Sequence, residues 1–218
     1  MRAKASHAET SPRPKPASIK ASSRRDFLKA GGVATAVMVV QPHVLGGPAH
    51  TAPSDRVNVA LVGAGGRGLQ NARELMKLQD VRISAVVDPA EYWDLSNFYY
   101  RGKAERLPVC NEIEKHYRQN EPNFKCHQQE DYRDLLNNHA SEVDAVLCAT
   151  PDHMHAHATL AAIRAGKHVY CEKPLTHNVA EARLVSRVAA EAGVATQLGN
   201  QGHSYRIHDV IYVRAKEK

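Results

Sequence analysis

The chain has 218 residues, 43% of them hydrophobic, which is enough for one ordinary domain with a buried core but not for two. Its formal net charge of +6 arises within residues 1–29, which contain eight basic and two acidic side chains. The rest of the chain carries 21 basic and 21 acidic residues, so it lacks the basic surface of a nucleic-acid-binding protein, and no nucleic-acid partner is expected.

Residues 1–49 are predicted to be an export signal rather than part of the fold. Residues 23–29 read S-R-R-D-F-L-K, which resembles the twin-arginine signal, and residues 30–40 follow as an uncharged, mostly apolar stretch. About eleven apolar residues are too few to cross a bilayer of roughly 30 Å, so no stable membrane anchor is predicted. We expect cleavage after Ala49 and export by the twin-arginine route to the periplasm or another extracytoplasmic space.

From Arg56 onwards, short apolar runs alternate with amphipathic helical stretches. Strands are predicted at residues 57–62, 81–87, 143–149, 167–171 and 194–198, with a weaker one near 124–127. The helix before the last strand has clear boundaries, because Asn178 and Glu181 form a capping box and Gly193 supplies a left-handed turn. Apolar strands separated by helices predict a doubly wound parallel α/β sheet over residues 50–202.

Residues 91–109 form a connection that is longer than usual for this fold and rich in aromatic side chains. Two interpretations are open. The segment is either a surface insertion that buries its aromatic side chains against the domain, or a lip over a bound cofactor or substrate.

The four cysteines, Cys110, Cys126, Cys148 and Cys171, include no C-x-x-C pair. In a chain of this size they are expected to be free thiols. A bridge between Cys110 and Cys126 stays open as an alternative.

The glycine-rich segment Gly63-Ala64-Gly65-Gly66-Arg67-Gly68 directly follows the first predicted strand and opens a helix. This is the G-x-G-x-x-G pattern of dinucleotide-binding Rossmann folds. We expect Gly63 to allow the tight turn, Gly65 to let a pyrophosphate approach the backbone, and Gly68 to let helix and strand pack closely. The helix N-terminus would then present free N–H groups to the phosphates.

Asp88 ends the second predicted strand, twenty residues after Gly68. A carboxylate at this place accepts hydrogen bonds from both ribose hydroxyls and repels a 2′-phosphate, so NAD is predicted in preference to NADP. Arg67, within the glycine motif, keeps NADP open as the less favoured alternative.

Two further motifs follow predicted strands that end at the same edge of the sheet. Residues 150–155 read T-P-D-H-M-H after the fourth strand, where the strand order should reverse and open a binding crevice. Residues 172–174 read E-K-P after the fifth strand. Lys173 would face this crevice, where an amine near a nicotinamide can orient a substrate hydroxyl or move its proton.

The alternating histidines His153, His155 and His157 do not predict a metal site. Side chains two residues apart on a helix diverge, and no cysteine or carboxylate lies nearby at the spacing of a zinc site. We therefore expect no metal.

The order of the motifs over about residues 56–205 resembles that of the Gfo/Idh/MocA family of dinucleotide-dependent oxidoreductases. The motifs are G-A-G-G-R-G, Asp88, T-P-D-H-M-H, C-E-K-P-L and L-G-N-Q-G. The resemblance implies that Lys173 lies beside the nicotinamide and is catalytic. Further cofactor-binding positions implied by motif match are Thr150, Pro151, His155, Glu172 and Gln201.

The resemblance also implies a substrate class and a second domain. Many family members oxidise or reduce a hydroxyl of a sugar, inositol or related polyol, with a His and usually an Asp supplied by a downstream α+β domain. We expect residues 203–218 to begin the linker to that domain, which this chain would lack, so that the chain alone would be an inactive fragment. The full-length form is expected to be a homo-oligomer. Two alternatives remain open: an NAD-dependent glycoside hydrolase of the same family, and a non-catalytic nucleotide-binding module.

Overall fold

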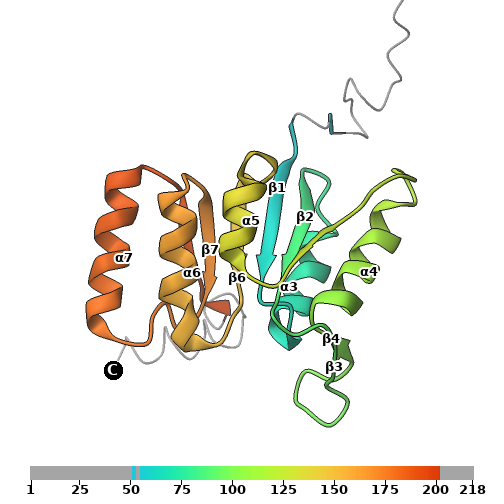
Figure 1. The fold of residues 1–218 in the computed structure, drawn as a ribbon, viewed down its shortest axis with the longest axis horizontal. Helices are drawn as coiled ribbons and strands as arrows, with labels where there is room; N and C mark the ends of the chain where they lie inside the picture. The colour runs from blue at the N-terminus through green and yellow to red at the C-terminus, as the bar shows by residue number, and fades with distance from the viewer. Residues whose placement is uncertain (1–50, 53–54, 202–218) are drawn as a thin grey trace, which may run out of the picture. The chain divides into compact units, whose positions relative to one another are not determined.

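The computed structural model describes residues 51–52 and 55–201, which build a six-stranded sheet in the order β5-β2-β1-β6-β7-β8 (Figure 1). The predicted signal segment 1–49 and the predicted linker 203–218 lie outside the described residues. No helix of the described part of the chain is long and apolar enough to cross a membrane.

Every neighbouring pair of strands in this sheet is parallel. The strands are β1 (Val57–Val62), β2 (Val81–Val87), β5 (His127–Gln129), β6 (Ala145–Cys148), β7 (His168–Glu172) and β8 (Thr196–Gly199). The doubly wound parallel sheet is therefore confirmed. Observed strand ends differ from the predicted ones by at most three residues, the largest difference being at β5.

The helices form a layer on each face of the sheet (Figure 1). On one face lie α3 (Gly66–Leu75) and α4 (Arg106–Tyr117), and on the other lie α5 (Tyr132–Asn138), α6 (Asp152–Arg164) and α7 (Val179–Ala192). A short 3-10 helix, η2 (Ala140–Glu142), precedes β6, and a small hairpin of β3 (Trp93–Asp94) and β4 (Lys103–Ala104) extends from the edge where β1 ends.

Alternate side chains of β1 enter the two cores. Val59 and Leu61 pack in the cluster that contains the buried side chains of α3 and α4, while Ala60 and Val62 pack in the cluster of α5, α6 and α7. A strand that is apolar on both faces is buried by helices on both sides, as expected for a parallel sheet.

Ser84 interrupts the apolar run of β2 because it is the extra residue of a β-bulge. Val59 pairs with Ile83 and the next residue, Ala60, pairs with Ala85, which leaves Ser84 without a partner in the ladder. Its hydroxyl donates instead to the carbonyl oxygen of Glu142, 3.3 Å away. The bulge ties β2 to the segment that leads into β6.

The boundaries predicted for α7 are confirmed. The Asn178 side chain accepts a hydrogen bond of 3.0 Å from the Glu181 backbone, and Gly193 ends the helix with φ +66°. The reciprocal bond of the capping box is displaced by one residue, since the Glu181 carboxylate accepts from the backbone of His177.

Gly63 and Gly68 allow the first strand, its turn and its helix to pack closely. Gly63 has φ +91°, a left-handed conformation that favours glycine. A Cβ atom at Gly68 would lie 1.9 Å from the Gly63 carbonyl oxygen. The predicted roles of these two glycines are therefore confirmed.

We predict that Gly68→Ala lowers the free energy of unfolding by about 3 kcal/mol or more, because the obstructing atom is backbone and cannot move aside without displacing the turn. Urea unfolding followed by circular dichroism measures this. Gly193→Ala is the matched control, because a Cβ atom at Gly193 meets no atom within 4 Å. Only the left-handed backbone conformation opposes this change, so the free energy of unfolding should fall by about 1 kcal/mol. Equal losses in the two variants would contradict the packing argument.

Candidate nucleotide-binding site

The crevice lies where β1 and β6 end side by side. The chain leaves β1 into α3 on one face of the sheet and leaves β6 into α6 on the other, so the two connections diverge. At this place a Cβ atom on Gly63 would lie 2.6 Å from the backbone of Ala149 and Thr150. The glycine motif and the T-P-D-H-M-H motif, far apart in sequence, are in direct contact.

The first turn of α3 has the features of an anion-binding helix start. Gly65 caps the helix without a side-chain hydrogen bond, and the turn contains no acidic residue. Backbone N–H groups at such a helix start are unsatisfied within the helix and carry the positive end of its dipole. These are the features that favour a phosphate at this position.

Asp88 follows β2 at the same edge, and its carboxylate is held in place by backbone donors. One oxygen accepts from the Ala64 N–H at 2.8 Å, and the other accepts from the Ala90 N–H at 2.9 Å. The residue is only 8% exposed. A carboxylate has about four acceptor sites, so Asp88 can still accept from a ribose hydroxyl while it remains fixed beside the glycine turn.

Glu105 is a second buried carboxyl group at this place, and it was not among the predicted site residues. Its backbone N–H donates to the Ala64 carbonyl oxygen at 3.1 Å, and its carboxyl group lies beside Gly65. Burial, followed by the hydrogen bond to Asp88 and the charge of Asp88, raises the pKa of Glu105 to about 8. At neutral pH the Glu105 carboxyl group therefore keeps its proton. No motif marks Glu105, and its φ of +77° is set by the turn into α4.

The segment 91–105 lies against the glycine motif. A Cβ atom at Gly66 would be 2.3 Å from Tyr100, so this ring covers the start of α3. The interpretation in which the segment buries its aromatic side chains is wrong: Tyr92, Trp93, Phe98, Tyr99 and Tyr100 are all exposed, by 39% to 91%. The position of the segment agrees with the other interpretation, a lip beside the glycine motif.

His155 joins the loops that follow β6 and β7. Its ring is 1% exposed; Nε2 lies 2.8 Å from the Thr150 carbonyl oxygen, and Nδ1 is hydrogen-bonded to the Pro174 carbonyl oxygen. Pro151 caps the start of α6. The ring of His155 therefore contacts backbone in both directions and sets the spacing of the two loops.

Glu172, the last residue of β7, connects three elements. One carboxylate oxygen accepts from Arg67 Nε at 3.1 Å and from Asn71 Nδ2 at 2.7 Å, and the other accepts from the Gln201 side chain. Glu172 is 4% exposed. This carboxylate holds α3 and Gln201, two residues beyond β8, against the end of β7.

Lys173, by contrast, is exposed directly after this buried carboxylate, and its peptide bond to Pro174 is cis. It lines a cavity of about 230 Å³ in the crevice. The other lining residues are Arg67, Tyr100, Ala149, Thr150, Asp152, His155, Glu172 and Gln201. An amine here faces a space large enough for a small ring and lies among the predicted cofactor-binding residues.

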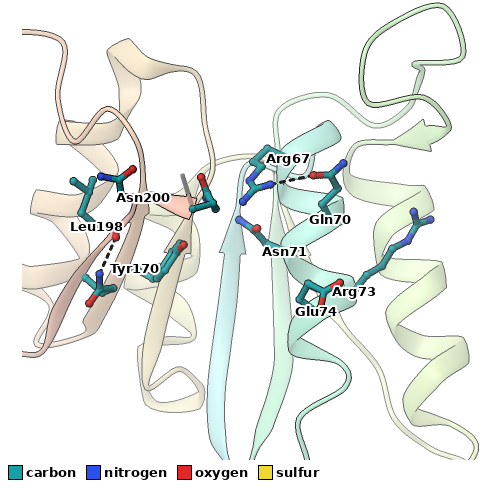
Figure 2. Close-up of a pocket in the computed structure, with 10 residues that line it drawn as sticks. Arg67, Gln70, Asn71, Arg73, Glu74, Tyr170, Leu198 and Asn200 are labelled. Atoms are coloured by element: carbon teal, nitrogen blue, oxygen red, sulfur yellow. Dashed lines mark hydrogen bonds between the residues drawn. The ribbon is translucent and has the colours of Figure 1, made fainter. Parts of the chain in front are cut away.

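A larger hollow of about 890 Å³ lies on the α3 side of the sheet (Figure 2). Arg67, Gln70 and Asn71 of α3 face it from one side, and Tyr170, Leu198 and Asn200 lie across from them. Arg67 and Gln201 line both cavities. The hollow therefore opens onto the same edge as the crevice.

The chain matches known protein families over most of its described length. A model of the oxidoreductase family with an NAD-binding Rossmann fold, Gfo/Idh/MocA, matches residues 57–200. A model of the twin-arginine translocation pathway signal sequence matches residues 22–40, within the part predicted to direct export.

Three relatives illustrate the similarity. The chain is 52% identical over 62 residues to a 1,5-anhydro-D-fructose reductase of Ensifer adhaerens, covering 28% of this chain and 18% of the reductase. It is 28% identical over 176 residues to glycosyl hydrolase family 109 protein 1 of Shewanella sp. strain ANA-3, covering 72% of this chain and 35% of the hydrolase. The crystal structure of GenD2 from gentamicin A biosynthesis, in complex with NAD, is 25% identical with a TM-score of 0.53, covering 68% of this chain and 36% of GenD2.

The chain thus spans about a third, or less, of the length of these relatives. The family match extends from the first residue of β1 to Asn200, and so includes the glycine motif, Asp88, T-P-D-H-M-H and E-K-P. Since this match covers more than half of the chain, the protein belongs to the Gfo/Idh/MocA family of oxidoreductases with an NAD-binding Rossmann fold.

Proposed function

We propose that this chain binds NAD(H) at the crevice. In the whole protein, we propose that the cofactor exchanges a hydride with a hydroxyl or keto carbon of a sugar, inositol or related polyol. The observation that carries the proposal is the fixed Asp88 carboxylate beside an uncapped helix N-terminus, because ribose hydroxyls and pyrophosphate need these two features next to each other. The similarity to a 1,5-anhydro-D-fructose reductase supports a sugar-like substrate.

The charges around Asp88 support NAD rather than NADP. Asp88 and Glu105 together carry at least one negative charge beside the ribose position, and a 2′-phosphate there would be repelled. Arg67 is the cation that could bind the 2′-phosphate of NADP, and it is paired with Glu172 on the α3 side of the crevice. Its charge is therefore already compensated by another anion.

The remaining predicted site residues fall into two roles. Lys173 and Thr150 line the 230 Å³ cavity, where we propose that Lys173 orients the substrate hydroxyl or moves its proton. His155, Glu172 and Gln201 make their contacts within the protein and act as positioning residues. The principal acid/base group and the substrate pocket would come from the length of the relatives that this chain does not match.

The signal match supports work outside the cytoplasm. The twin-arginine route carries folded proteins, so the enzyme would be exported with its cofactor already bound, and we propose the periplasm as its location. A cofactor-bound exported enzyme needs a tight nucleotide site, which agrees with the burial of Asp88 and Glu105.

A glycoside hydrolase that oxidises its substrate transiently is the second candidate, supported by the relatives of glycosyl hydrolase family 109. The two activities differ in their redox balance. A dehydrogenase forms one NADH for each substrate oxidised, whereas the hydrolase cleaves nitrophenyl glycosides with no net change in NADH. Measuring nitrophenol and NADH absorbance in one assay of the whole protein separates them.

We predict that Asp88→Asn lowers NADH affinity about tenfold or more, since a charge-assisted hydrogen bond contributes about 1.5–3 kcal/mol. NADPH affinity should fall less, because the substitution also removes a repulsion. Titrations of the purified chain, followed by nicotinamide fluorescence, measure both. Asp134→Asn, an exposed carboxylate on α5, is the control and should bind as the wild type does. Equal NADH affinity in the two variants would remove Asp88 from the site.

We predict that Glu105→Gln flattens the pH dependence of stability. The folded-state pKa of Glu105 is about 8 against an ordinary value of 4.5, so between these values the folded state binds more protons than the unfolded state. The contribution of Glu105 to the free energy of unfolding of the wild type should therefore be greatest below about pH 4.5. It should fall by as much as a few kcal/mol as the pH rises to about 8. Urea unfolding at several pH values tests this, with the exposed Glu130→Gln as control. The idea fails if Glu105→Gln keeps the wild-type slope.

We predict that Lys173→Met in the whole protein lowers kcat about 10²–10⁴-fold and leaves the Kd for NADH unchanged, because the amine acts on the substrate proton and not on the cofactor phosphates. Steady-state assays against a panel of sugars and inositols, with NADH titration alongside, measure the two constants. Unchanged kcat would argue against Lys173. Absence of turnover in the wild type despite NADH binding would favour a non-catalytic module.

A further inference from the structure

A cluster of two histidines and one carboxylate lies outside the nucleotide site. His127 is the first residue of β5, His139 follows α5, and Glu142 ends η2. His127 Nε2 lies 2.8 Å from one Glu142 carboxylate oxygen, and His139 Nδ1 lies 2.9 Å from the other. One ligand atom from each of the three side chains lies within 4.8 Å of the other two.

The backbone holds these three residues in place independently of their side-chain contacts. His127 pairs with Ala85 in the sheet, and the Glu142 carbonyl oxygen accepts from Ser84 of the same strand, at the bulge. His139 donates its N–H to the Leu135 carbonyl oxygen at 2.8 Å, which closes the end of α5. Backbone hydrogen bonds and the Ser84 contact therefore position the three residues so that their side chains meet.

The spacing fits a tetrahedral metal site after a small adjustment. Zinc binds imidazole nitrogen at about 2.0–2.1 Å and carboxylate oxygen at about 2.0–2.2 Å, which places ligand atoms about 3.4 Å apart. The two His–Glu contacts would have to open by about half an ångström to reach this separation. The side chains are 26% to 48% exposed, so a metal can enter and water can take a fourth position.

The charges also favour a cation between these side chains. The two rings lie with their centroids 4.5 Å apart, so two imidazolium ions here would repel each other, whereas a metal binds the neutral rings. The Glu142 carboxylate, which contacts both rings, supplies an anionic ligand for a divalent cation.

The buried group of Cys148, His155 and Cys171 is also compact enough for a metal but is unsuitable. Both ring nitrogens of His155 already face backbone carbonyl oxygens, so neither is free to coordinate an ion. The exposed cluster differs because His127 Nε2 and His139 Nδ1 face the carboxylate that would share the metal with them.

We propose that His127, His139 and Glu142 bind one Zn²⁺ or a similar divalent transition metal, with water completing the coordination. The metal would tie the three-residue edge strand β5 to the segment that leads into β6. The carbonyl oxygen of Gln129, at the end of β5, accepts from the Asp88 N–H at 3.1 Å. A metal that fixes β5 would therefore also support Asp88 at the end of β2. This proposal departs from the expectation that the chain binds no metal, which was argued from His153, His155 and His157 and did not consider this cluster.

The test is a calorimetric titration of the purified, chelator-treated chain with ZnCl₂, together with thermal melting. The wild type should show a saturable site and a higher melting temperature with zinc. Glu142→Gln and His139→Gln should each lower zinc affinity at least about tenfold and abolish the rise in melting temperature. His157→Gln, which removes an exposed imidazole from α6, is the matched control and should behave as the wild type does.

Absence of saturable binding in the wild type, or wild-type binding by Glu142→Gln, would overturn the proposal. Circular dichroism without zinc establishes that the variants are folded. If either variant does not fold, X-ray anomalous scattering at the zinc edge from zinc-soaked wild-type crystals decides the matter. A peak between the three side chains supports the site, and a peak elsewhere or none refutes it.

Discussion

Close backbone contact at the glycine turn is the constraint on which the rest of the structure depends. Gly68 leaves room for the Gly63 carbonyl oxygen, and Gly63 in turn lies against the backbone of Ala149 and Thr150. A side chain at either glycine would push β1, β6 or α3 apart, and with them the loops that form the crevice. The start of α3, the Asp88 carboxylate and the Lys173 amine meet at one edge because these contacts are so short.

Buried carboxylates organise this edge, and each is stabilised in a different way. Asp88 accepts from two backbone N–H groups, and Glu172 accepts from three side-chain donors on two other elements. Glu105 has Asp88 as its carboxyl neighbour, so it retains a proton instead. A buried carboxyl group is tolerated only when donors, cations or protons compensate the loss of water, and here all three are used.

Groups of different charge follow one another along the edge of the sheet where β1, β2, β6 and β7 end. Acidic groups surround the position expected for the adenosine ribose, the positive end of α3 lies between, and Lys173 is exposed at the other end. His155 keeps the loops after β6 and β7 at a constant spacing through two backbone carbonyl groups. This order of charges suits an elongated ligand with a central pyrophosphate and a reactive ring at one end.

The sequence by itself predicted the doubly wound parallel sheet and the export signal, and it singled out the glycine turn, Asp88 and Lys173, because these depend on local periodicity and on motifs within short segments. The order of the strands came from the tertiary structure. Tertiary structure alone decided the roles of side chains that meet across long separations. Glu105 beside Asp88, the engagement of Arg67 by Glu172, the exposed aromatic residues of segment 91–105, and the cluster of His127 with Glu142 all belong to this group. The physical reason is that periodicity reports which face of an element is buried, whereas the pairing of polar groups depends on which elements the folded sheet brings together.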